Sequence, residues 1–229
     1  MIDMMFQQLR KTVIIAIVCL TFSIKSFGIN YTFSSNSGSY TSNVGGTTIW
    51  ATPLDNATTS NIPIGFDFTF GTNSPVTEVT VNSNGWISLG SNVISNSSSF
   101  STNNLATTSF GPILAPLWDD LKIATGGNVN YITTGTAGNR VFTVEWYKMK
   151  WDYGALDAVI SFQVKLYEVN GDIEFSYKTE ASNVSWGSAS IGIANQSTTD
   201  FYSLSDATSS PIANYSVETN TISTKPATG

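Results

Sequence analysis

Residues 62–70 read Ile-Pro-Ile-Gly-Phe-Asp-Phe-Thr-Phe, with a large apolar side chain at every second position. Successive side chains of a β-strand point to opposite faces, so a period of two predicts a strand with one buried face. No segment beyond residue 28 shows a comparable helical period. The pattern therefore predicts an all-β fold.

Turn residues separate further candidate strands along the chain. Asn84-Gly85 lies between residues 76–83 and 86–89, and this dipeptide suits the positive φ angles of a tight hairpin. Asn170-Gly171 divides residues 159–169 from 172–177 in the same way. Other strands are predicted at residues 48–51, 113–118, 129–133, 140–146, 189–194 and 201–204. About ten short strands with turns every 8–12 residues are typical of an antiparallel β-sandwich, here expected to be jelly-roll-like.

Residues 1–28 have the pattern of a signal peptide. Arg10 and Lys11 precede an apolar run over residues 12–22, which is short for a membrane span. Ser26 and Gly28 are small residues at the spacing of a cleavage site. We therefore expect export, with cleavage near Gly28–Ile29 and no membrane span afterwards; an uncleaved membrane anchor is the alternative.

Composition narrows the classes of site that the remaining residues 29–229 can hold. The single cysteine, Cys19, lies in the apolar run, so cleavage would leave no disulfide, thiol nucleophile or cysteine metal site. An exported chain without disulfides favours a bacterial source. Removing three basic residues and one acidic residue takes the net charge from −6 to −8. An acidic chain of this kind argues against nucleic-acid binding, which needs clustered Lys and Arg.

The expected domain organisation is a signal peptide at residues 1–28, a β-sandwich at 29–206 and a linker or tail at 207–229. Beyond Ala207 the strand pattern is lost, so neighbouring domains in a longer chain are also expected. Residues 92–109 are rich in Ser, Asn and Thr and are either a binding loop or an ordinary long surface loop.

Three segments together resemble a known module. They are residues 62–68, residues 81–90 (Val-Asn-Ser-Asn-Gly-Trp-Ile-Ser-Leu-Gly) and residues 115–120 (Ala-Pro-Leu-Trp-Asp-Asp). The series resembles a β-sandwich module of large secreted Bacteroidota proteins, many of them exported by type IX secretion. Its middle is similar to the nidogen-like extracellular domain. The resemblance implies a secreted or cell-surface module and transfers no catalytic residues.

Histidine is absent from the whole chain, which excludes Ser-His-Asp triads, Cys-His dyads and histidine-ligated zinc. Carboxylate chemistry remains. Asp119 and Asp120 follow a predicted buried strand, and with Asn128 or nearby carbonyls they offer the hard oxygen ligands that calcium prefers.

Two alternatives exist for the same pair of aspartates. Asp119 or Asp120 could act with Glu145 as the two carboxylates of a glycoside hydrolase. Alternatively, the carboxylates cap exposed backbone N–H groups at a strand end, or pair with Lys122 or Arg140.

The aromatic residues divide into two groups. Trp86, Trp118 and Trp146 fall inside strand patterns and are expected in the core. A second group falls between predicted strands and is the candidate sugar-stacking platform: Trp151, Tyr153 and Trp186.

The sequence thus favours an exported, non-catalytic binding or adhesion module at the cell surface that recognises a glycan or surface protein. A carboxylate-based glycoside hydrolase, or its accessory domain, is the enzymatic alternative. A structural spacer in a larger surface protein is the third hypothesis.

Overall fold

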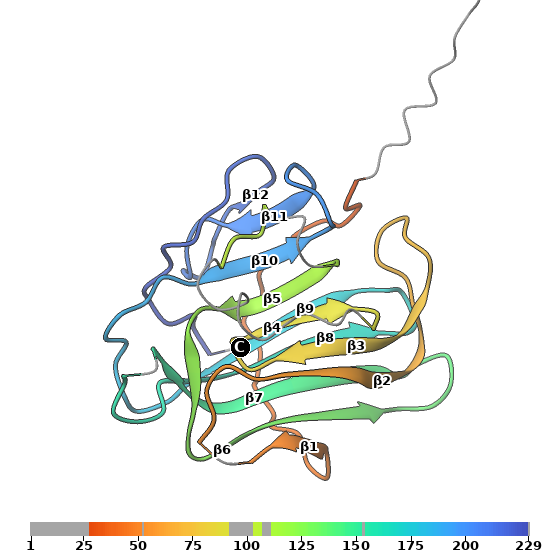
Figure 1. Cartoon of the computed structure of the whole chain (residues 1–229). Helices are drawn as coiled ribbons and strands as arrows, with labels where there is room; N and C mark the ends of the chain where they lie inside the picture. Colours follow the sequence, from red (N-terminus) through yellow and green to blue (C-terminus); the bar gives the residue numbers. More distant parts are fainter. Residues whose placement is uncertain (1–27, 52, 92–102, 107–110, 153, 229) are drawn as a thin grey trace, which may run out of the picture.

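The computed structural model describes residues 28–51, 53–91, 103–106, 111–152 and 154–228. This part of the chain contains twelve strands and no helix, arranged as two antiparallel sheets that face each other (Figure 1). The five-stranded sheet runs in the order β1 (Thr47–Trp50), β6 (Leu121–Thr134), β7 (Val141–Trp151), β8 (Ile160–Tyr167) and β9 (Ile173–Thr179). The seven-stranded sheet runs in the order β12 (Ala213–Asn214), β11 (Phe201–Leu204), β10 (Ser190–Ala194), β5 (Ile113–Trp118), β4 (Trp86–Leu89), β3 (Val76–Asn82) and β2 (Thr58–Phe68). The all-β sandwich prediction is confirmed.

Strand β2 has the period of two that its sequence predicts. Ile62, Ile64, Phe66 and Phe68 are buried, and the residues between them are exposed. The described structure has two layers, so the side chains of β2 that point away from the other sheet meet solvent.

The β3–β4 hairpin turns at Asn84-Gly85, as expected, and Gly85 has φ +82°. A Cβ atom on Gly85 would overlap the carbonyl oxygen of Leu117, so the close approach of β5 requires glycine there. The same turn aims the Asn84 side chain at the backbone N–H of Leu121, which donates to its Oδ1 at 3.0 Å.

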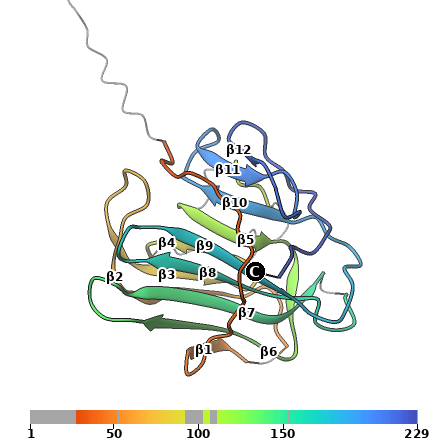
Figure 2. The ribbon, with the colours of Figure 1, turned by 180° about the vertical axis from the view of Figure 1, so that it is seen from behind.

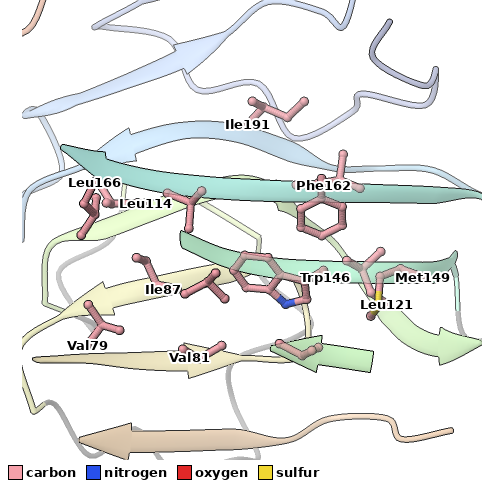
Figure 3. Close-up of a cluster of buried hydrophobic side chains, with 14 of the residues drawn as sticks. Val79, Val81, Ile87, Leu114, Leu121, Trp146, Met149, Phe162, Leu166 and Ile191 are labelled. Atoms are coloured by element: carbon pink, nitrogen blue, oxygen red, sulfur yellow. The ribbon is translucent and has the colours of Figure 1, made fainter. Parts of the chain in front are cut away.

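The main core lies between the sheets (Figure 3). Trp146 of β7 stacks on Phe162 of β8 with ring centroids 5.1 Å apart, and its indole N–H donates to the Asn82 carbonyl of the opposite sheet at 3.0 Å. Trp146 is therefore fully buried with its polar atom satisfied, which is how a buried indole is normally accommodated.

A second cluster lies on the outer face of the larger sheet. Trp86 and Trp118 have ring centroids 5.7 Å apart, and they pack with Leu105, Ile113 and Phe201. The prediction that Trp86, Trp118 and Trp146 are core residues is confirmed, since none of them is exposed.

Residues 29–46, which we call the strap, cross the outer side of the molecule from the β10–β11 end down to β1 (Figure 2). Tyr31 of the strap packs on Phe70 with centroids 5.5 Å apart, and its hydroxyl donates to the Gly171 carbonyl. Further along, the strap covers the polar face of the five-stranded sheet. The strap thus bridges both sheets.

Residues 207–228, expected as a linker or tail, contribute strand β12 and further contacts with the sandwich. Ile222 is buried and forms an antiparallel bridge with Ala189. The Lys225 ammonium donates to the carbonyls of Glu180 and Ser182, at 2.9 Å each. Within the described residues, no helix has the length and apolar character needed to cross a membrane.

Candidate functional site

Asp119, predicted as a calcium ligand, is a buried hydrogen-bond acceptor at the end of β5. Its Oδ2 accepts the Trp151 indole N–H and the Ser188 backbone N–H, both at 2.7 Å. Its Oδ1 accepts the Ser188 hydroxyl at 3.0 Å and the Asp120 backbone N–H at 2.9 Å. Four donors therefore converge on this carboxylate, which matches the strand-end capping alternative and does not favour Asp119 as a metal ligand.

Asp120 has the opposite environment. Its Oδ1 is buried with no hydrogen-bond partner in the structure, and the same holds for Asp55 Oδ1. Burial, followed by the negative charges of Asp55, Asp119 and Asp152, raises the pKa of Asp120 to about 6. Burial also raises the pKa of Asp55, although Lys122 partly offsets it. Burial and the neighbouring negative charges therefore destabilise the ionised form of Asp120 at neutral pH.

The described residues contain no group of three or more acidic, histidine or cysteine side chains placed to hold a metal ion. Calcium binding through Asp120 stays a prediction.

Trp151 is not an exposed platform residue, so that part of the predicted glycan site is wrong. Its side chain is completely buried, because β7 continues to residue 151 instead of ending at 146. The register of β7 against β8 shifts between Trp146 and Met149, where Lys148 has φ +54°. This bulge restores Met149 and Trp151 to the core face and breaks the simple alternation that the sequence shows.

The two other platform residues have different outcomes. Trp186 is 79% exposed in the β9–β10 connection, as predicted. Tyr153 lies outside the described residues. Trp151 points into the core, so the structure does not join it with Trp186 in one sugar-binding surface.

Glu145, the possible second catalytic carboxylate, is only 1% exposed. It lies on the face of β7 opposite to Trp146, under the strap. The Tyr40 hydroxyl and the Gln163 amide donate to its Oε1 at 2.7 and 3.1 Å, and the Asn43 backbone and Asn130 amide donate to its Oε2 at 3.2 and 3.0 Å. Glu145 thus anchors the strap and does not face Asp119 across a cleft.

One open site in the described structure is a groove of about 780 Å³. The larger sheet extends past the edge strand β9, so the inner faces of β10 and β11 are not fully covered by the smaller sheet. Strap residues 31–38 form one wall, and residues 206–213 and 226–228 form another. We call this site the β9–β11 groove; its volume falls within the range of ligand pockets.

Six aromatic residues, beside several serine and threonine residues, contribute to the lining of the β9–β11 groove. They come from the strap, β8, β9 and β11, and they are Tyr31, Phe33, Tyr167, Phe175, Tyr177 and Tyr202. Phe33 is the most open of the large apolar ones, with 42% exposure. The floor between them is formed by Ile191, Gly192 and Ile193 of β10.

The charged residues that line the groove, Asp172, Glu174 and Asp206, are all acidic. Burial raises the pKa of Glu174, but hydrogen bonds from Lys165, Tyr167 and Ser176 outweigh it, so the net shift is downward. The Thr208 hydroxyl and amide lower the pKa of Asp206. The groove therefore keeps negative charge at neutral pH.

Comparison with known proteins identifies the family. A family model described as NIDO related matches residues 30–229, which is most of the chain. The chain belongs to the NIDO-related family. Membership indicates an extracellular module, in agreement with the resemblance to nidogen-like domains. No curated protein and no solved structure matches this NIDO-related chain.

Proposed function

We propose that this NIDO-related domain is an exported, non-catalytic binding module that recognises neutral or cationic glycans in the β9–β11 groove. The observation that carries the proposal is an open groove lined by aromatic rings and ionised carboxylates, without lysine or arginine among the described lining residues. Sugar rings have apolar C–H faces and hydroxyl rims, so aromatic side chains complement the faces and carboxylates accept from the hydroxyls.

The charge of the groove supports a selection among glycans. Asp172 and Asp206 would repel uronic acids and sulfated sugars and attract amino sugars, whereas the charge of Glu174 is offset by its salt bridge with Lys165 at 2.6 Å. The net charge of −6 of the whole chain also repels acidic glycans and attracts cationic ones at long range.

The enzymatic alternative has less support. A glycosidase needs two carboxylates facing one substrate, and retaining or inverting mechanisms place them about 5–10 Å apart. Asp119 and Glu145 are each buried and saturated by hydrogen bonds to their own neighbours. Neither of them lines the β9–β11 groove.

The resemblance to modules of type IX-secreted Bacteroidota proteins supports the finer proposal of a bacterial surface protein with neighbouring domains. Cell fractionation with an antibody against the native protein tests it, because surface display makes the protein accessible to added protease in intact cells.

A glycan-array screen tests the proposed function, with neutral, amino-sugar and acidic glycans printed side by side. We expect binding among the neutral and amino-sugar glycans, weakened about 2- to 12-fold by Phe33→Ala. Leu156→Ala is the matched control, since Leu156 is 97% exposed and lies outside the groove lining. Absence of glycan binding would favour the spacer hypothesis or a protein partner. Glycan binding that Phe33→Ala does not affect would place the glycan site outside the β9–β11 groove.

A further inference from the structure

The structure contains a preformed acceptor for a new amino terminus at Ile29. The backbone nitrogen of Ile29 donates to Asp200 Oδ1 at 2.7 Å. Ile29 itself is 8% exposed and belongs to the main core, although it lies at the very start of the described chain. Figures 1 and 2 both show this start beside the β10–β11 end of the larger sheet.

Asp200 is held in place independently of Ile29. It directly precedes β11, and its Oδ2 accepts the Asn195 side-chain amide at 3.0 Å. The Asn195 backbone N–H donates to the Asp200 carbonyl at 2.9 Å, and Asn73 donates to the Asn195 side chain at 3.1 Å. The carboxylate is thus fixed by the β10–β11 turn and pointed at the Ile29 nitrogen.

We propose that proteolytic maturation occurs between Gly28 and Ile29, and that the new α-ammonium of Ile29 forms an ion pair with Asp200 that locks the strap onto the sandwich. In the cleavage, water adds across the Gly28–Ile29 amide. The C–N bond breaks, Gly28 gains the hydroxyl oxygen as a carboxylate, and the Ile29 nitrogen takes both protons to become an ammonium group. The hydrogen bond from an uncharged amide to the Asp200 carboxylate thereby becomes an ion pair between opposite charges.

The contacts around Ile29 favour cleavage at the Gly28–Ile29 peptide bond over cleavage at neighbouring peptide bonds. Cleavage after Ile29 would remove a core side chain, and cleavage after Tyr31 would also remove the ring that packs on Phe70. Cleavage before Gly28 would leave the Ile29 nitrogen as an uncharged amide opposite a carboxylate. The family match begins at residue 30, so residues 1–29 lie outside the matched region.

The proposed Ile29–Asp200 ion pair also affects one wall of the β9–β11 groove, because that wall is formed by strap residues 31–38, close behind Ile29 in the chain. A charged anchor at the first residue holds this wall in place, together with the Tyr202 hydroxyl, which donates to the Ile29 carbonyl at 3.3 Å. Maturation then strengthens the attachment of the strap, which the precursor holds by a hydrogen bond from an uncharged amide to the Asp200 carboxylate.

The test starts from the full-length chain, produced in a bacterium that exports it. Intact mass spectrometry and amino-terminal sequencing of the exported protein should give residues 29–229, with Ile29 first. A double-mutant cycle then uses Asp200→Asn and a serine inserted between Gly28 and Ile29, which moves the ammonium away from Asp200. If processing of the insertion variant again leaves Ile29 first, selective acetylation of the wild-type α-amine takes its place.

We expect Asp200→Asn to lower the Tm of the protein with a free Ile29 terminus by about 3–10 °C. In the serine-extended or acetylated protein the same substitution should lower the Tm by less than half as much. An exported protein that begins at a residue other than Ile29 would overturn the proposal. An equal Tm decrease in both backgrounds would overturn it as well.

Discussion

Trp151 donates its indole N–H to Asp119 Oδ2 at 2.7 Å, and this bond joins the end of β7 to the end of β5. The sequence predicts Trp151 as a sugar-stacking residue and Asp119 as a calcium ligand, but in the structure the two side chains form one buried hydrogen bond. Since both side chains are almost fully buried, this hydrogen bond contributes to the stability of the fold and is not accessible to a ligand.

Asp119→Ala should destabilise the protein by about 3 kcal/mol, because it leaves the buried donors of Trp151 and Ser188 without an acceptor. Urea unfolding followed by tryptophan fluorescence measures the change. Trp151→Phe should cost less, about 1–2 kcal/mol, and the double variant should be less destabilised than the sum. Additive effects would contradict a direct partnership.

Asp120→Asn should stabilise the protein above about pH 6. The folded-state pKa of Asp120, about 6, is higher than the unfolded value of about 3.9. Below about pH 4 the group is protonated in both states and costs nothing; its cost appears as the pH rises and is complete above the folded pKa. Since Asp120 is partly exposed, the stabilisation is roughly 1 kcal/mol. Thermal unfolding from pH 4 to 8 should show the variant gaining over wild type as the pH rises, and a constant difference would refute this.

The predicted calcium site depends on the same carboxylates. If calcium binds there, it removes the repulsion at Asp120 and raises the Tm of the wild type more than that of Asp120→Asn. Scanning calorimetry with calcium and with a chelator measures both shifts. An equal response of the two proteins would rule out Asp120 as a ligand.

Glu145→Gln should act on stability. Two of the four donors to Glu145 come from the strap, so the substitution places an amide NH₂ against existing donors at a buried position. We expect a loss of about 2–3 kcal/mol and easier proteolysis of residues 29–46. Limited proteolysis with mass spectrometry reads this out. A variant with unchanged stability would mean that the network does not hold the strap.

Gly85→Ala should disrupt the fold more than any conservative surface change, by about 3 kcal/mol or more, since the new Cβ would overlap the Leu117 carbonyl and Gly85 has φ +82°. Gly138→Ala is a useful comparison, because Gly138 also has positive φ but has open space around it. Its cost should be limited to backbone strain of about 1 kcal/mol.

The features that sequence predicts well in this protein are local. The period of two in β2, the Asn84-Gly85 hairpin and the Asn170-Gly171 turn each depend on a few neighbouring residues, and all are present. The prediction that Trp151 is exposed is wrong because a bulge at Lys148 changes the phase of β7, and a bulge leaves little signal in a single sequence.

The groove could not be predicted because its parts are distant in the chain. Phe33, Phe175 and Tyr202 meet only after the larger sheet extends beyond β9 and the strap crosses it. The number of strands in each sheet is a consequence of topology, which no local pattern encodes.

The most direct test of glycan recognition is an NMR titration of the exported protein with the best glycan from the array. The account predicts that amide shifts concentrate on the groove floor, at Ile191, Gly192 and Ile193, and on the neighbouring Tyr202 of β11. Phe33→Ala should weaken these shifts, and Leu156→Ala should not. Shifts centred instead on Trp186, or on the strap-covered face around Glu145, would contradict the assignment of the β9–β11 groove as the binding site.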